Sequence, residues 1–155
     1  NLYYIDKDGE KKTPVVLHRA ILGSLDRFMA YILEETKGNL PTWLAPVQTR
    51  VMPVKTDDEA LNAYAKEVYD TLMENDIRVE LDDRAEKLGY RMRDGQIQKV
   101  PYLLVIGMNE KDNKTVTFRL HGEQETTTLP LDEFVENLKK EINEIARTHM
   151  NHTEA

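Results

Sequence analysis

The stretch "VQTRVMPVKTDDEALNAYAKEVYDTLMENDIRVEL" (residues 47–81) decides the fold, because the spacing of its apolar residues changes twice. Residues 47–54 have the composition of a strand, and helical spacing begins after Thr56. The core positions of this helix are Leu61, Tyr64 or Ala65, Val68 and Leu72. Apolar and charged residues then alternate from Ile77 to Leu81, as in a half-exposed strand. The order strand, helix, strand predicts an α/β fold.

The start of this helix is predicted from its first polar residues. Thr56 and Glu59 have the spacing of a capping box, in which the hydroxyl accepts from a backbone N–H and the carboxylate reaches back. We therefore expect residues 56–59 to form the cap that opens the helix.

The chain after residue 81 continues the alternation of element types. Residues 84–98 form a basic, helical segment that contains Gly89 and Gly95, and residues 100–107 are a buried strand. We expect residues 108–114 to be a turn and residues 115–122 to complete a hairpin with that strand. A last amphipathic helix covers residues 131–148. Its inward positions are Phe134 or Val135, Leu138, Ile142 and Ile145. The whole pattern predicts helices layered on a mixed sheet.

The chain before residue 47 reads as a separate unit. Residues 13–17 predict a strand, and residues 21–36 predict a helix that ends at Gly38. Its apolar face is formed by Leu22, Leu25, Met29 and Leu33. The stretch "GNLPTWLAP" (residues 38–46) then concentrates helix-breaking residues, as linkers do. We expect a domain boundary there, with residues 1–42 on one side and residues 43–155 on the other.

Composition limits the class of protein. Hydrophobic residues make up 40% and charged residues 32%, as in globular proteins. The apolar run at residues 101–108 is too short to cross a bilayer and the N-terminus has no signal-peptide core, so we expect a cytosolic protein that contacts no membrane. The absence of cysteine excludes disulfides and thiolate ligands from this chain. Since the chain begins at Asn1 in sequence typical of a domain interior, we expect a fragment of a longer protein.

Charge is strongly segregated along the chain, although the net charge is -7. Residues 57–83 hold ten acidic and two basic residues, whereas residues 84–99 hold five basic and two acidic residues. Basic segments beside acidic ones are usually solvated surfaces, but they can also bind polyanions. Residues 84–99 are therefore the candidate basic surface.

Three motifs in order resemble the C-terminal part of the threonyl-tRNA synthetases, a family of class II aminoacyl-tRNA synthetases. They are "TPVVLHRAILGSLDRF" (13–28), "LPTWLAPVQ" (40–48) and "DDRAEKLGYRMRDGQIQKVPYLLVIG" (82–107), followed by the terminal amphipathic helix. The resemblance implies an anticodon-binding domain with a mixed, about five-stranded sheet flanked by helices. It also implies that residues 1–42 are a strand–helix remnant of the class II catalytic domain, carrying its third motif. The parent protein would be a threonine–tRNA ligase.

The resemblance assigns roles to three residues of the first unit. Arg27 matches the arginine that contacts ATP phosphates, which suits the planar fork of a guanidinium. Ser24 matches a position that lines the threonine pocket. His18 matches one zinc ligand of a site whose other ligands, a cysteine and a second histidine, lie earlier in the family's catalytic domain. The parent would thus use zinc and magnesium-ATP, while we expect neither in this fragment.

The resemblance also assigns positions that contact the tRNA anticodon. Sequence-specific RNA readers hydrogen-bond the edges of unstacked bases, and arginine suits the O6 and N7 acceptors of guanine. The assigned positions are Arg93, Glu110 and Arg119, with Glu86 and Lys87 nearby. This sequence departs from the family pattern at Ala85, where asparagine is common, and at Asn109, where lysine can occur. Tyr90 and Tyr102 could stack on bases, although core packing is the more common fate of such residues.

The resemblance names partners but leaves alternatives open. The parent would bind threonine tRNA, ATP and threonine, and would be a homodimer mainly through its catalytic domain, while the fragment could be a monomer. On its own the fragment should bind tRNA without catalysing ligation, because most of the catalytic domain is missing. The alternatives are a freestanding RNA-binding or regulatory module with this fold, and a generic α/β ligand-binding domain.

Overall fold

The computed structural model describes the backbone of residues 2–150 and the side chains of residues 2–144. Within this part, a five-stranded sheet has the strand order β4-β3-β5-β6-β7. The strands are β3 (Thr49–Pro53), β4 (Val79–Leu81), β5 (Tyr102–Ile106), β6 (Thr115–Leu120) and β7 (Thr127–Pro130). Strand β3 pairs in parallel with β4 and β5, whereas β6 and β7 continue the sheet in antiparallel pairs. The prediction of a mixed, about five-stranded sheet is confirmed.

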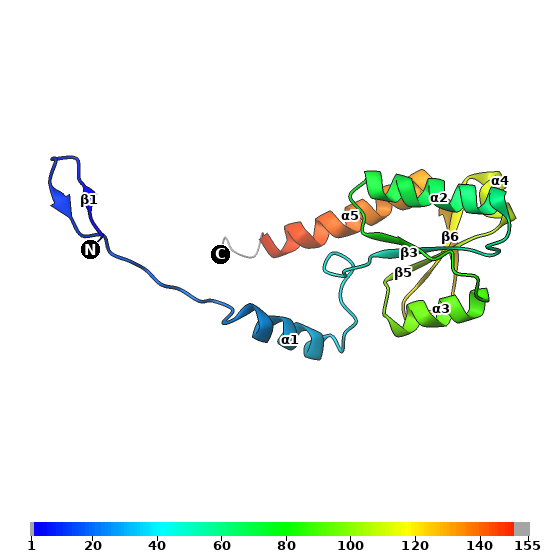
Figure 1. The fold of residues 1–155 in the computed structure, drawn as a ribbon, viewed down its shortest axis with the longest axis horizontal. Coiled ribbons are helices and arrows are strands. Elements are labelled where there is room, and N and C mark those ends of the chain that lie inside the picture. Colours follow the sequence, from blue (N-terminus) through cyan, green and yellow to red (C-terminus); the bar gives the residue numbers. More distant parts are fainter. Residues whose placement is uncertain (1, 151–155) are drawn as a thin grey trace.

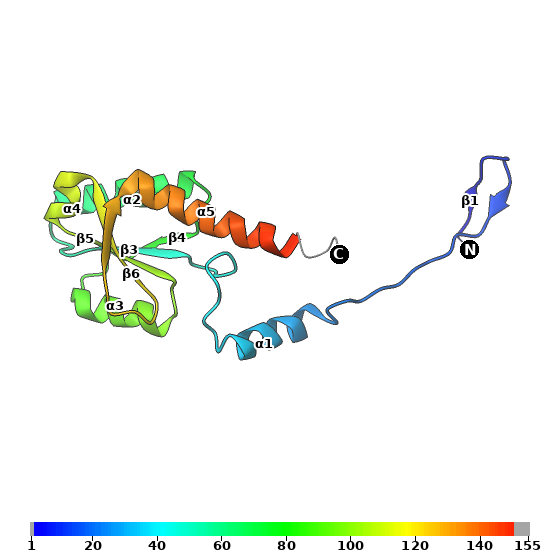
Figure 2. The same cartoon turned by 180° about the vertical axis from the view of Figure 1, so that it is seen from behind.

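Helices lie on both faces of this sheet, which makes three layers (Figure 1). The helices α2 (Glu59–Glu74) and α5 (Leu131–Met150) cover one face, and α3 (Leu88–Ile97) lies on the other. The view from behind shows the same arrangement (Figure 2). A short helix, α4 (Met108–Asn113), links β5 to β6. No described helix is both long enough and apolar enough to cross a membrane.

The larger core lies between the sheet and the layer of α2 and α5. The predicted stripe of α2 is buried throughout, at Leu61, Tyr64, Ala65, Val68 and Leu72, and the last four of these belong to this core. From α5, Phe134, Val135 and Leu138 are buried and Ile142 packs against them, while the side chain of Ile145 lies outside the described residues. Helical periodicity therefore identified both inner faces correctly.

A second, smaller core fastens α3 to the opposite face. Met52, Val100 and Leu103 are buried there, with Leu88 and Met92 of α3 packed against them. Gly95 makes this close approach possible, because a Cβ at that position would lie 2.5 Å from Cδ2 of Leu103. The glycine that weakens the helical pattern in the sequence is thus required by the packing of the helix.

The N-terminal segment stands apart from the sheet (Figure 1). It contains a small hairpin of β1 (Tyr4–Ile5) and β2 (Lys11–Lys12), followed by the helix α1 (Leu25–Glu35). The prediction that Gly38 stops this helix is confirmed, since its φ is 75° and its N–H donates to the Leu33 carbonyl at 2.8 Å.

Two predictions for this segment are wrong. Residues 13–17 form no strand, because no neighbouring strand among the described residues pairs with them. The apolar face of α1 is not buried, since Leu25, Met29 and Leu33 are 74%, 45% and 44% exposed. α1 makes no extensive contact with another described helix or strand, so periodicity predicted the face correctly but not its burial.

Three local predictions in the sheet domain are also corrected. Asp58, not Thr56, caps α2, because its carboxylate accepts from the N–H groups of Ala60 and Leu61 at 3.0 and 3.1 Å. Residues 108–113 form the helix α4 instead of a turn. Strand β7 was not predicted, because four residues that include three polar or proline positions give little strand signal.

Candidate nucleic-acid interface

One part of the sheet has no helix over it. Thr117 and Arg119 of β6 pair with Val105 and Leu103 of β5, whose side chains pack beneath α3. Residues that pair directly across strands share a face, so Thr117 and Arg119 lie on the side of α3. Since α3 packs over β3 and β5, these two side chains and Thr128 of β7 remain accessible. We call Thr117, Arg119 and Thr128 the open sheet face.

Arg119 is held in one orientation on this face. Its Nε donates to the Glu123 carbonyl at 2.6 Å, and its Nη2 donates to Gln124 Oε1 at 3.1 Å. Both acceptors come from the loop between β6 and β7. The edge formed by Nη1 and the second hydrogen of Nη2 has no partner among the described residues, so it can still donate two hydrogen bonds to one planar group.

Glu110 ends the open sheet face with a fixed carboxylate. Its Oε2 accepts from the Gly107 N–H at 2.9 Å, as in a capping box at the start of α4. Its Oε1 accepts from the hydroxyl of Thr117 at 2.7 Å. Thr117 is two residues from Arg119 on the same face, so the structure brings the predicted residues Glu110 and Arg119 together.

Arg93 is exposed on the outer side of α3. Together with Tyr90, Asp94 and Ile97 it lines a shallow hollow. Three residues further along the helix, Gln96 Oε1 accepts from the Gly122 N–H at 3.3 Å, which brings this side of α3 to the end of β6. Arg93 forms no ion pair with another described residue and remains available to a ligand.

The two tyrosines have different fates. Tyr102 packs in the core, where its ring lies 5.6 Å from that of Phe118 and its hydroxyl contacts Glu141 at 2.5 Å. Tyr90 is 57% exposed, so the expectation of core packing is wrong for this residue. The reason is its position on α3, opposite Gly95 and Arg91, which face the sheet. Tyr90 therefore offers an aromatic ring beside Arg93.

Glu86 and Lys87 are exposed at the start of α3. They follow β4, and Glu110 follows β5; since these strands are both parallel to β3, the two loops leave the same edge of the sheet. Arg91 holds the loop between β4 and α3 in place from its buried side. Its guanidinium donates to the carbonyls of Pro53, Asp82 and Glu86 at 2.7, 2.8 and 3.2 Å. Arg91 is fully buried, and this burial lowers the pKa of its guanidinium.

The predicted basic surface is therefore smaller than residues 84–99 suggest. Arg91 is buried, Arg84 is paired with Asp82 and Asp94, and the ammonium of Lys99 contacts the Lys37 carbonyl. Lys87 and Arg93 keep their charges unpaired among the described residues. The interpretation of this segment as a basic surface is corrected, because three of its five cations serve the fold.

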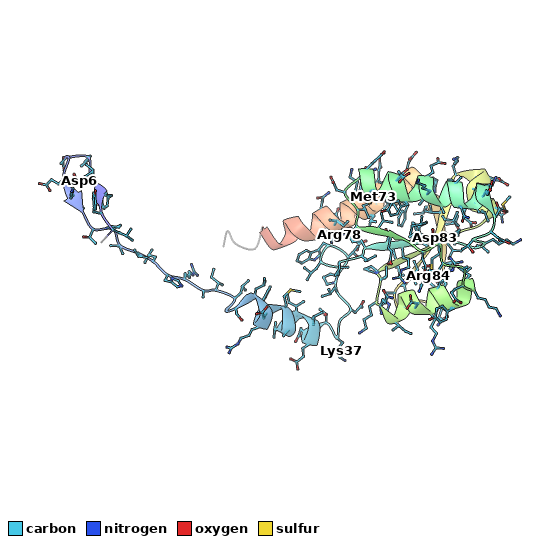
Figure 3. The ribbon with its side chains drawn as sticks, in the orientation of Figure 1. Asp6, Lys37, Met73, Arg78, Asp83 and Arg84 are labelled. Atoms are coloured by element: carbon cyan, nitrogen blue, oxygen red, sulfur yellow. The ribbon has the colours of Figure 1, made fainter. Side chains whose placement is uncertain are left out.

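An ion-pair network stands beside this surface and was not predicted. Arg50, only 2% exposed, donates to Glu80 at 2.7 Å and to Asp94 at 3.3 Å. Arg84 joins Asp82 at 2.7 Å to the same Asp94 at 2.8 Å. Figure 3 places Arg84 and its neighbour Asp83 between the sheet and α3. The network ties β3, β4 and α3 together.

The residues assigned to a catalytic centre lie far from this interface. His18 is exposed in the extended segment before α1. Ser24 caps α1, with its hydroxyl accepting from the Arg27 N–H at 3.4 Å, and Arg27 is exposed in the first turn. The described residues contain no group of three or more side chains that could hold a metal ion. The donor set near His18 therefore does not fit a zinc ion without ligands from outside these residues.

The two residues that depart from the family pattern are exposed near Glu86 and Glu110. Ala85 is exposed beside Glu86, and Asn109 is exposed in α4, where its carbonyl accepts from Asn113 at 2.9 Å. The sequence analysis did not name Thr117 and Thr128, which share the open sheet face with Arg119. A signal existed for Thr117, because the alternation of residues 115–122 puts it on the same face as Arg119.

Comparisons with known proteins identify the family of this chain. Residues 48–141 match the family described as "Anticodon binding domain". The threonine–tRNA ligase of Anoxybacillus flavithermus is 46% identical over 142 residues, which is 92% of this chain and 22% of that protein. The same enzyme of Caldanaerobacter subterraneus subsp. tengcongensis is 48% identical over 141 residues, which is 91% of this chain and 21% of that protein. The chain thus spans about a fifth of these relatives.

Solved structures give the same result. The RNA binding domain of threonyl-tRNA synthetase from Cryptosporidium parvum superimposes with a TM-score of 0.73 at 37% identity, covering 86% of this chain and 33% of the other. A prolyl-tRNA synthetase from that organism matches with a TM-score of 0.62 at 23% identity, over 68% of this chain and 22% of the other, which supports the fold alone. The chain belongs to the anticodon binding domain family, in the form found in threonine–tRNA ligases.

Proposed function

We propose that this chain binds the anticodon loop of threonine tRNA and is the tRNA-recognition part of a longer threonine–tRNA ligase. The observation that carries the proposal is that a fixed donor, Arg119, lies on the open sheet face and a fixed acceptor, Glu110, lies at its end. The match of residues 48–141 to the anticodon binding domain family supports it.

The chemistry of this pair suits the bases concerned. Threonine anticodons share G and U at their second and third positions. The free edge of Arg119 can donate to O6 and N7 of guanine, while Glu110 can accept an N–H of a base edge. Tyr90 offers a ring for stacking, which is sequence-tolerant. We propose that Arg93, Glu86 and Lys87 complete the contacts.

For the complete protein we propose ATP-dependent ligation of threonine to its tRNA in the cytosol. Residues 1–42 would then be the end of its catalytic domain, and residues 43–155 its anticodon-binding domain. Arg27 would contact ATP phosphates, Ser24 the threonine pocket, and His18 would supply one ligand to zinc, with magnesium accompanying ATP. The other ligands and the main dimer contacts would come from the preceding catalytic domain.

Binding of tRNA to the 155-residue chain tests the proposal. We expect tighter binding of a threonine tRNA transcript than of transcripts with altered second or third anticodon bases. Arg119→Ala should lower affinity for the unaltered tRNA by about 10- to 100-fold, because a bidentate arginine–base contact is worth about 1–3 kcal/mol. Binding is measured by fluorescence anisotropy at fixed salt concentration.

Arg19→Ala is the matched control, since Arg19 is an exposed arginine outside the sheet domain. It should leave the affinity unchanged. Equal, weak binding of all transcripts would contradict the proposal and favour a generic ligand-binding domain. Ligation of threonine by the 155 residues alone would contradict the assignment of chemistry to the longer protein.

A further inference from the structure

We infer that Thr117 and Thr128 are positioning residues, which hold the Glu110 carboxylate in the orientation in which it reads an anticodon base. This inference rests on the proposed function. It concerns how the site discriminates between bases, rather than whether the chain binds RNA.

The first observation is that Glu110 is fixed from two sides. Oε1 accepts from the Thr117 hydroxyl on β6, and Oε2 accepts from the Gly107 N–H at the end of β5. The two donors belong to different elements, so the carboxylate cannot rotate about its terminal bond without breaking one of these hydrogen bonds. Rotation about this bond is otherwise broad and nearly free.

The second observation is steric. A Cβ at residue 107 would lie 2.8 Å from Glu110 Oε2, so the carboxylate rests directly against the glycine backbone. Gly107 therefore leaves the space that the bound carboxylate fills. With Oε2 seated there, Oε1 is the oxygen that remains nearest the open sheet face.

The third observation is the direction of the hydrogen bonds. The hydroxyl oxygens of Thr117 and Thr128 lie 2.7 Å apart, and either could donate by distance alone. An ionised carboxylate only accepts, so the single proton of Thr117 must point to Glu110. Thr117 must then accept from Thr128. The chain Thr128 to Thr117 to Glu110 thus has one polarity, and each member is held by the next.

The consequence concerns specificity. A carboxylate that can rotate adapts to several donor patterns, whereas a fixed one accepts well only from a base whose N–H lies in its path. Oε1 retains lone-pair capacity beyond the bond from Thr117. This hydrogen-bonded relay from Thr128 through Thr117 to Glu110 should therefore sharpen discrimination between bases while contributing little to overall affinity for RNA.

Two substitutions at residue 117 separate positioning from stability. Thr117→Val removes the hydroxyl but keeps a β-branched side chain that suits a strand. Thr117→Ser keeps the hydroxyl but suits the strand less well. We expect discrimination between threonine tRNA and its altered transcripts to fall by about tenfold in Thr117→Val, and to stay near that of the unsubstituted chain in Thr117→Ser. In thermal unfolding, by contrast, Thr117→Val should be the more stable of the two variants.

A double-mutant cycle with Glu110→Gln tests whether Thr117 acts on base discrimination through Glu110. The anticodon position at which Glu110→Gln lowers discrimination is the position that Glu110 reads, and Thr117→Val should lower it at that same position. In the Glu110→Gln background, Thr117→Val should have no further effect, because its action passes through the carboxylate. Thr128→Val should give a smaller loss. Thr127→Val should give none, because Thr127 is an exposed neighbour whose side chain makes no hydrogen bond to a described residue.

The results that overturn the inference differ from those that overturn the proposed function. If the unsubstituted chain binds all transcripts equally, the proposed function fails. If it discriminates and Thr117→Val discriminates equally well, only the relay fails. An equal loss in Thr117→Ser and Thr117→Val, or additive effects of Thr117→Val and Glu110→Gln, would also overturn it.

Discussion

At Asp82, burial and charge act on the carboxyl in opposite directions. Burial raises its pKa, but the side-chain and backbone hydrogen bonds and the charge of Arg84, with help from Arg91, outweigh burial and lower the pKa below its usual value. The pKa of Asp94 is also lowered, first by its hydrogen bond from Arg84. Arg84 therefore couples folding to the ionisation of two carboxylates.

This coupling predicts a pH-dependent loss of stability in Arg84→Met. A carboxyl whose pKa is lower in the folded state stabilises the fold above its unfolded value, here about 3.8, and this contribution is lost as pH falls toward the folded value. The difference in unfolding free energy between the unsubstituted chain and Arg84→Met should be fully present at pH 6 and should shrink below pH 4. Urea titrations across this range measure it, with Arg93→Met as the exposed control.

A difference that is constant from pH 6 to pH 3 would show that Arg84 acts by packing alone.

Residues such as Arg50 and Arg91 explain why the network could not be predicted from the sequence. Arginine is almost never fully buried unless it is paired, and its partners here are up to 48 residues away along the chain. No local pattern reports such partners.

The element that depends most on one residue is α3. Its approach to β5 needs Gly95, since a Cβ there would meet both terminal methyls of Leu103 at 2.5 and 3.2 Å. Leu103 is itself fully buried and has little room to move. Gly89 lies in the same helix with nothing within 4 Å of an added Cβ.

These two glycines form a matched pair of substitutions. Gly95→Ala should destabilise the fold by about 1–3 kcal/mol, because overpacking forces α3 away from the sheet. Gly89→Ala should be neutral or stabilise by up to about 1 kcal/mol, because alanine favours the helix. Chemical denaturation measures both values, and equal effects at the two positions would mean that the close contact with Leu103 is not decisive.

At this scale the sequence predicted elements with a clear period and missed those without one. The apolar stripe of α2 and the alternation in β6 are regular because both elements pack along their length against a core that extends over several turns or strands. Helix α4 has six residues, mostly polar, and gives no apolar period. In the run Thr56, Asp57 and Asp58, three residues could each cap a helix, so spacing alone could not choose Asp58.

The whole molecule consists of the sheet domain and a segment that scarcely contacts it. Among the described residues, a hydrogen bond from Lys99 to the Lys37 carbonyl joins residues 1–37 to the sheet domain. By contrast, residues 41–48 are anchored, since Arg78 donates to the carbonyls of Trp43 and Ala45 at 2.7 and 2.9 Å. In Figure 3, Arg78 lies at the sheet and Lys37 at the end of α1.

Deletion of residues 1–37 should therefore leave the thermal unfolding midpoint within about 2 °C, because one exposed contact contributes little. Deletion of residues 1–47 should lower it clearly, because Arg78 loses both acceptors. Calorimetry of the three chains makes the comparison. A large fall after the shorter deletion would mean that α1 stabilises the sheet domain in solution.

Charge is distributed unequally between the two sides of the sheet. The layer of α2 and α5 carries exposed carboxylates at Glu59, Glu67, Asp70, Glu74, Asp132, Glu133 and Glu136. These outnumber its exposed lysines, whereas Lys87, Arg93 and Arg119 lie on the side of α3. A polyanion that diffuses toward the molecule is repelled by the first layer, and it meets the unpaired cations Lys87 and Arg93 on the side of α3. If the chain binds tRNA as proposed, the acidic helices would steer the approaching RNA away from their own side of the sheet before the first hydrogen bond forms.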